Sequence, residues 1–196
     1  MVQLFPSSVA ASVFYPVLWL WLLSEVVGAG IIPRLRRHGT RIERNDKGSH
    51  LLIFISIFMS IVITFSFATS GIAMLPNWVF YPGIVLMVFG IVFRQWSITV
   101  LGRFFSTMVG VQKGQKVVDK GPYRLVRHPA YTGGLLTLVG LGLALQSWGA
   151  VLLLALIFSL TFGYRIYVEE RVLVSELGDE YVKYTKWTKR LIPYIL

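Results

Sequence analysis

The sequence contains no cysteine among its 196 residues. This absence excludes disulfide bonds, thiolate nucleophiles, iron–sulfur clusters and cysteine-based zinc sites. Charge is also scarce, because only 14% of the residues are charged, whereas about a quarter are charged in an average soluble domain. Hydrophobic residues make up 55% of the chain, and its mean hydropathy is +0.67. These proportions argue against a soluble fold and predict an all-α membrane protein.

Several motifs of nucleotide and hydrolase chemistry are missing as well. The chain has neither a Walker loop nor a GxSxG elbow. Its clustered glycines between residues 133 and 142 lie in an apolar run and not between a strand and a helix, so a Rossmann site is not supported. The three histidines have no metal-ligand spacing and no accompanying carboxylate cluster. We therefore expect no metal site.

Five apolar stretches are candidates for membrane-spanning helices, because about 20 residues cross the hydrocarbon core at a rise of 1.5 Å each. They are residues 9–32, 51–69, 79–100, 131–145 and 148–167. Only two residues separate the last two, which predicts a tight antiparallel helical hairpin. Small residues spaced four apart predict that the two hairpin helices pack closely against each other. These pairs are Gly140 with Ala144, and Ser159 with Gly163.

All 19 lysines and arginines fall in three windows, at residues 34–47, 94–127 and 165–190. The connections between the other ends of the apolar stretches carry no charge. The positive-inside rule therefore places the three windows in the cytoplasm, with the amino terminus outside and the carboxyl terminus inside. Anionic membrane lipids, and not nucleic acid, are the expected partners of this charge. Arg94 is expected to snorkel to the inner interface.

We expect one membrane domain over residues 1–196. Residues 1–70 form two N-terminal spans, and residues 79–196 form the third span, the hairpin and a C-terminal catalytic region. A cleaved signal peptide is not expected, because the first apolar run is too long and no basic segment precedes it. The apolar residues of the tail recur every three to four positions, which predicts an amphipathic helix at the membrane surface. They are Leu173, Leu177, Tyr181 and Tyr184.

Ionisable residues beside apolar stretches are the first candidates for chemistry, since each is costly in hydrocarbon. Glu25 stands alone in the first stretch, and we interpret it as structural. Arg165 and Glu169 are four residues apart and share one helix face, where the last apolar stretch ends. They form either a functional pocket or a plain interfacial ion pair.

A second dense segment, KGPYRLVRHPAYTGG, covers residues 120–134. Pro129 keeps His128 out of helical dihedrals, so a helix begins shortly afterwards, at about Tyr131. The unpaired amides of that helix start favour a carboxylate or phosphate. The alternative role of His128 is a structural or capping one.

The order GPYRLVRHPAY, a helical hairpin, EERVL, LGDEY and RLIP resembles the isoprenylcysteine carboxyl methyltransferase family of membrane enzymes. The resemblance covers about half of the chain, residues 94–193. It implies an S-adenosylmethionine cofactor in a cytoplasmic pocket, formed by the polar linker and the C-terminal helix. The implied cofactor-binding residues are Gln115, Lys116, Val117, Val118, Tyr123, His128, Pro129, Ala130, Tyr131 and Glu169.

The resemblance also implies that Arg165 binds the substrate and that Arg165 and Glu169 are catalytic. Family members commonly have histidine where this chain has Gln115, so this contact is expected to be weaker or made by the backbone alone. The implied reaction is methyl transfer to the carboxylate of a prenylated cysteine or similar lipidic acceptor, which enters from the membrane. The implied location is the plasma membrane in a prokaryote or the endoplasmic reticulum in a eukaryote.

The residues fit such a reaction, because a carboxylate nucleophile needs no general base and catalysis reduces to positioning and desolvation. The Arg165 guanidinium can hold an acceptor carboxylate with two hydrogen bonds, while Glu169 faces the cofactor or orients Arg165. Three alternatives stay open: a phospholipid-amine N- or thiol S-methyltransferase, an NADPH-dependent membrane reductase, and a non-catalytic membrane scaffold. The oligomeric state is left open.

Overall fold

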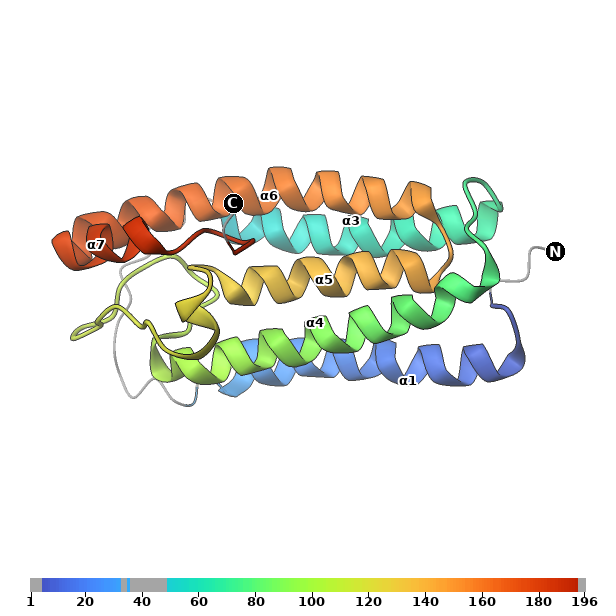
Figure 1. Cartoon of the computed structure of the whole chain (residues 1–196), viewed down its shortest axis with the longest axis horizontal. Helices are drawn as coiled ribbons and strands as arrows, with labels where there is room; N and C mark the ends of the chain where they lie inside the picture. The colour runs from blue at the N-terminus through green and yellow to red at the C-terminus, as the bar shows by residue number, and fades with distance from the viewer. Residues whose placement is uncertain (1–4, 33–34, 36–48, 194–196) are drawn as a thin grey trace.

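The computed structural model describes residues 5–32, 35 and 49–193, and within them all regular structure is helical (Figure 1). The predicted cytoplasmic window at residues 34–47 lies outside these ranges, apart from residue 35. The longer helices are α1 (Ser8–Ser24), α3 (Ser49–Ser70), α4 (Phe80–Leu101), α5 (Pro129–Ala144), α6 (Trp148–Leu177) and α7 (Asp179–Trp187). A π-helical segment, η1 (Glu25–Ile31), continues α1, and short 3-10 turns are η2 (Asn77–Val79), η3 (Gly102–Phe104) and η4 (Gly121–Arg124).

Four helical stretches in the described part of the chain are long and apolar enough to cross a membrane. They are Ser8–Gly28, Leu51–Ser70, Asn77–Phe104 and Trp148–Leu177. The fifth predicted span corresponds to α5, which has 16 residues and is shorter than these. An all-helical fold with four candidate membrane helices is thus observed in the described residues, and the fifth crossing stays a prediction.

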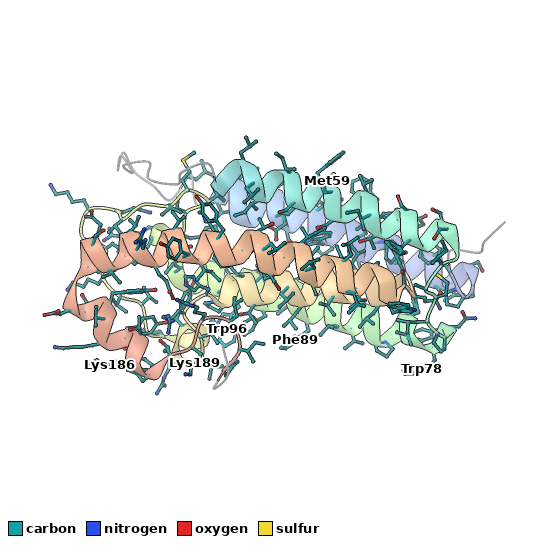
Figure 2. All side chains as sticks on the ribbon, turned by 90° about the horizontal axis from the view of Figure 1, so that it is seen from above. Met59, Trp78, Phe89, Trp96, Lys186 and Lys189 are labelled. Carbon is teal, nitrogen blue, oxygen red and sulfur yellow. The ribbon has the colours of Figure 1, made fainter. Side chains whose placement is uncertain are left out.

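The long helices run side by side, and both ends of the bundle have a distinct character (Figure 1). Each helix contacts the next in a series: α1 packs on α4, α4 on α5, α5 on α6 and α6 on α3. One end holds the uncharged connections, and the other holds the polar linker between α4 and α5 together with α7. Figure 2 shows Trp78 at the first end and Lys186 and Lys189 at the second. Most of the described lysines and arginines therefore lie at a single end of the molecule.

The closest helix contact differs from the predicted one. A Cβ atom on Gly140 would lie 2.5 Å from the backbone nitrogen of Met87, and one on Gly83 would lie 2.3 Å from that of Ala144. Nothing comes within 4 Å of a Cβ on Gly163. Gly140 therefore seats α5 against α4, and the prediction that Gly140 and Gly163 join the two hairpin helices is wrong. The hairpin helices do meet at Gly142, where a Cβ atom would lie 3.1 Å from the backbone nitrogen of Val151. Spacing identified a close contact but not the partner helix.

One prediction gains a detail and another is corrected. The Arg94 guanidinium pairs with Glu25, a partner that the sequence did not predict, while its position at the membrane interface stays a prediction. The tail is not one amphipathic helix on the membrane surface, since α6 continues to Leu177 and Gly178, at φ 56°, breaks it from α7. That positive φ suits glycine because it has no Cβ. The apolar face of the tail is then turned inward, over the polar linker.

Candidate functional site

A cavity of about 850 Å³, its open mouth included, lies at the end of the bundle that holds the polar linker. Its walls come from the linker, η4, the start of α5, the end of α6 and α7. The cavity is thus assembled by segments far apart in the sequence.

The linker wall is shaped by turns that follow α4. Gly102 ends α4 at φ 60° and Gly114 turns the chain at φ 74°, conformations that suit glycine. The backbone N–H of Gln112 donates to Gln115 Oε1 at 3.0 Å, and the N–H of Gln115 donates to the carbonyl of Gln112 at 2.9 Å. The Gln112 side chain in turn donates to the carbonyl of Arg103 at 2.8 Å. The Gln115 side chain is therefore used to hold this turn.

The start of α5 forms the second wall. His128 is the N-cap residue, and Pro129 is the first residue of the helix, where its missing N–H leaves no donor unpaired. The rings of His128 and Tyr131 are stacked, with centroids 5.5 Å apart and an interplanar angle of 7°. The His128 N–H donates to the carbonyl of Arg190 at 3.0 Å, which ties the chain after α7 to this wall.

A hydrogen-bonded cluster joins α5 to α6. The Tyr131 hydroxyl donates to Glu169 Oε2 at 2.6 Å, and Arg165 Nε lies 3.3 Å from the same hydroxyl oxygen. Arg165 is buried, lies 3.9 Å from the Glu169 carboxylate and also donates to the carbonyl of Thr107 at 2.8 Å. Arg165 and Glu169 are therefore linked through Tyr131, and Arg165 is also bonded to the linker, so the two residues are more than an exposed surface pair.

The neighbouring carboxylate has a different environment. Glu170 accepts hydrogen bonds from Arg127 Nε at 2.9 Å and from Arg190 at 3.0 and 2.8 Å. The Arg127 side chain also donates to the carbonyl of Thr188. Glu170 therefore fastens the chain after α7 to the start of α5, and both of its oxygens are occupied.

Helix α7 closes the cavity from the outside. The Tyr184 hydroxyl donates to the carbonyl of Tyr123 at 2.6 Å, and the N–H of Val117 donates to Glu180 Oε1 at 3.2 Å. Burial raises the pKa of the Tyr123 and Tyr184 phenols above their ordinary value. Tyr184 therefore stays protonated at neutral pH and keeps its donor role.

The structure brings nearly all of the predicted cofactor residues to this cavity. Its lining includes Gln115, Lys116, Val117, Val118, Tyr123, His128, Ala130, Tyr131 and Glu169. Pro129 is buried and outside the lining, and Arg165 lies behind Tyr131. The sequence did not predict the apolar part of the lining, which comes from the last residue of α4 and the linker that follows it. These residues are Leu101, Phe104, Phe105, Met108 and Val109. The sequence analysis also missed the inward direction of the tail residues Leu173, Leu177, Tyr181 and Tyr184, although their spacing was the signal.

Two buried polar atoms fit the cavity to a polar ligand. Within the described chain, His128 Nε2 and the Tyr181 hydroxyl have no hydrogen-bond partner, and both residues line the cavity. His128 Nε2 lies 3.5 Å from Glu170 Oε1, which is too far for a good hydrogen bond. Such atoms are costly unless a ligand or water pairs them. In the described residues no cluster of three or more histidines and carboxylates could hold a metal ion.

Similar proteins are found by both sequence and structure. Protein-S-isoprenylcysteine O-methyltransferase B of Arabidopsis thaliana is 28% identical over 120 residues, which are 60% of this chain and 61% of that protein. A cobalt-zinc-cadmium resistance protein of Cupriavidus metallidurans is 34% identical over 98 residues, 50% of this chain and 45% of that protein. The match thus spans about three fifths of the first relative and under half of the second.

The structure of the eukaryotic intramembrane Ras methyltransferase, an isoprenylcysteine carboxyl methyltransferase, is similar with a TM-score of 0.66 and 22% identity. The likeness covers 95% of this chain and 68% of that one, so the two share a fold. The resemblance seen in the sequence is confirmed by these matches. The sequence profile of the phospholipid methyltransferases matches residues 78–180. Because the matched region is more than half of this chain, the chain belongs to the phospholipid methyltransferase family.

Proposed function

We propose that this protein is an integral membrane methyltransferase that uses S-adenosylmethionine to methylate the carboxylate of a prenylated cysteine or a similar lipidic acceptor. One observation carries the proposal: nearly all residues expected to bind the cofactor converge on one cavity, with Tyr131 and Glu169 in its lining and Arg165 directly behind Tyr131. The family membership and the names of the relatives support the same activity.

The cavity residues fit the cofactor by their chemistry. The unpaired His128 Nε2 and Tyr181 hydroxyl can bond its polar groups, and the apolar linker residues can cover its uncharged parts. S-adenosylmethionine supplies an electrophilic methyl group on a sulfonium. Helix α7 and the linker cover part of the cavity, which limits the access of water and favours transfer over side reactions.

Arg165 is the residue that we assign to the acceptor carboxylate. Its guanidinium has several donors in one plane, which suits a carboxylate. The Tyr131 and Glu169 oxygens keep the Arg165 side chain extended toward the linker. An ionised carboxylate acceptor carries no proton, so no residue has to act as a base.

We also propose the placement in the membrane that the charge pattern predicts. The cavity end faces the cytoplasm, with five crossings, the amino terminus outside and the carboxyl terminus inside. The cofactor then enters from water, and the acceptor enters sideways from the lipid. The membrane is the plasma membrane in a prokaryote and the endoplasmic reticulum in a eukaryote.

An amine acceptor is the second candidate, and the accessible Glu169 favours it. A protonated amine must lose a proton before it attacks, and Glu169 is the carboxylate with free acceptor capacity, since Glu170 is occupied. The pH dependence separates the candidates. Transfer to a carboxylate is flat above the pKa of the acceptor, whereas transfer to an amine rises with pH.

The test measures transfer of labelled methyl from S-adenosylmethionine to a farnesylated cysteine analogue, a phospholipid amine and a thiol. We expect transfer to the farnesylated carboxylate, and we expect Arg165→Ala to lower it at least 100-fold while cofactor binding persists. Arg171→Ala is the matched control, because Arg171 is an exposed arginine of the same helix over the Tyr167 ring. Absence of transfer to every acceptor by the wild type, or equal activity of Arg165→Ala, would refute the assignment.

A further inference from the structure

Two charged residues occupy otherwise uncharged helices. Glu25 precedes every other charged residue of the chain, and Arg94 is the one charged residue of α4. They meet inside the bundle, with Arg94 Nε 2.6 Å from Glu25 Oε1 and a second guanidinium nitrogen 2.8 Å from Oε2. The two charges neutralise each other, which an apolar environment requires.

Arg94 makes a third contact, and this one reaches the cavity wall. Its remaining guanidinium nitrogen donates to the carbonyl of Ala130 at 2.8 Å. Ala130 lies in the first turn of α5 and lines the cavity, and in the sequence it falls between His128 and Tyr131, whose rings are stacked. A single side chain therefore joins the end of the first helix, α4 and the start of α5.

The backbone around this contact leaves little room for movement. A Cβ on Gly133 would lie 2.7 Å from the backbone nitrogen of Arg94, so α5 is seated directly on α4. Gln95 donates to the carbonyl of Ser24 at 3.2 Å, and a Cβ on Gly28 would overlap its side chain. The π-helical segment η1 begins at Glu25 itself, and such segments are frequent at functional sites.

We propose that Glu25 and Arg94 form a positioning pair that fixes the start of α5, and with it His128 and Tyr131, in the cavity wall. This inference rests on the proposed function in one respect, the identity of the ligand that the cavity wall binds. Neither residue touches the cavity, so the pair acts through Ala130. The pair also gives the first helix, which lines no part of the cavity, a direct link to it.

The geometry predicts why arginine is required at position 94. Only a planar guanidinium can bond both oxygens of a carboxylate and a carbonyl in a third direction. Lysine conserves the charge but presents a single nitrogen, which cannot reproduce this set. Charge alone is therefore not sufficient.

Three variants test the inference. Arg94→Lys keeps the charge, the double variant Glu25→Gln with Arg94→Gln removes both charges together, and the exchange Glu25→Arg with Arg94→Glu restores neutrality with the guanidinium on the other helix. Thr99→Val is the control, since Thr99 is exposed on α4 and bonds only its own helix. For each protein we measure amide hydrogen exchange over residues 131–134 and the dissociation constant of S-adenosylmethionine.

We expect all three variants to exchange these amides at least 10-fold faster than the wild type and to bind the cofactor at least 10-fold more weakly. The neutral double variant keeps the test valid if a variant with an unpaired charge fails to fold. The proposal would be overturned if the neutral double variant kept the amide protection and the cofactor affinity of the wild type. It would also be overturned if the charge-swapped variant, Glu25→Arg with Arg94→Glu, recovered both in full. If the wild type itself does not bind S-adenosylmethionine, the proposed function fails, while the exchange rates still test the positioning.

Discussion

Replacing Gly83 by alanine tests the seam between α4 and α5, which places the start of α5 beside the cavity. The added Cβ would lie 2.3 Å from Ala144 N and 2.7 Å from the carbonyl carbon of Leu143. Carbon atoms normally approach to about 3.5–4.0 Å. Because the obstacle is backbone and cannot rotate away, the two helices must separate by about 1 Å.

The expected cost follows from the packing of this seam. Extra atoms in a well-packed core typically cost about 1–3 kcal/mol, and the backbone obstacle puts Gly83→Ala in the upper part of that range. For a chain of this length, 1 kcal/mol lowers Tm by roughly 2–4 °C. We therefore expect thermal unfolding in detergent to show a Tm roughly 4–12 °C below that of the wild type.

Gly163→Ala is the matched control on α6. Nothing comes within 4 Å of its added Cβ, so the substitution only removes the backbone freedom of glycine. This should stabilise the helix by about 0.5–1 kcal/mol. Opposite shifts of Tm are thus expected, and equal Tm values for the two variants would refute the assignment of the α4–α5 seam.

Two further predictions concern the closing elements. Burial raises the pKa of the Tyr181 phenol, so its stabilising contribution is complete below the ordinary tyrosine pKa of about 10 and is lost above it at up to about 1.4 kcal/mol per pH unit. Tyr181→Phe should therefore make the fall of Tm between pH 9.5 and 11 shallower, and an identical fall in both proteins would contradict this. Glu180→Ala removes the acceptor of the Val117 N–H, a bond worth about 0.5–1.5 kcal/mol, so thermal unfolding should show a Tm roughly 1–6 °C lower than that of the wild type. Glu176→Ala, an exposed carboxylate of α6, is its control, and an equal loss in both would count against the linker contact.

The bounds of the helices were predictable from the sequence to within a few residues, except at the end of α6. There the sequence does not show whether a residue continues the apolar helix or belongs to the tail. The length of its apolar run placed α4 at 79–100, and the structure has it at Phe80–Leu101. The end of α6 was predicted ten residues early, because hydropathy detects where the membrane ends and not where a helix ends. Gly178, with its positive φ, is the signal for that end.

The site was predictable only where adjacent residues carry it. The segment around His128 and Tyr131 and the pair Arg165 and Glu169 are close in sequence or at helical spacing, so their proximity could be inferred. The contact of Arg94 with Glu25 joins positions 69 residues apart, and no local pattern identifies such a partner. The same holds for the partner helix of Gly140, since small residues permit close approach without specifying a neighbour.

The unequal lengths of two consecutive helices determine how deep the cavity lies. At 1.5 Å per residue, α5 is about 24 Å long and α6 about 45 Å, and α5 ends at the turn from which α6 starts. The first residue of α5 therefore lies about 21 Å short of the end of α6, and this step is where the cavity is built. Since a hydrocarbon core is about 30 Å thick, the proposed placement in the membrane would put the bottom of the step below the level of the headgroups, where an amphiphile can present its polar end without leaving its own leaflet.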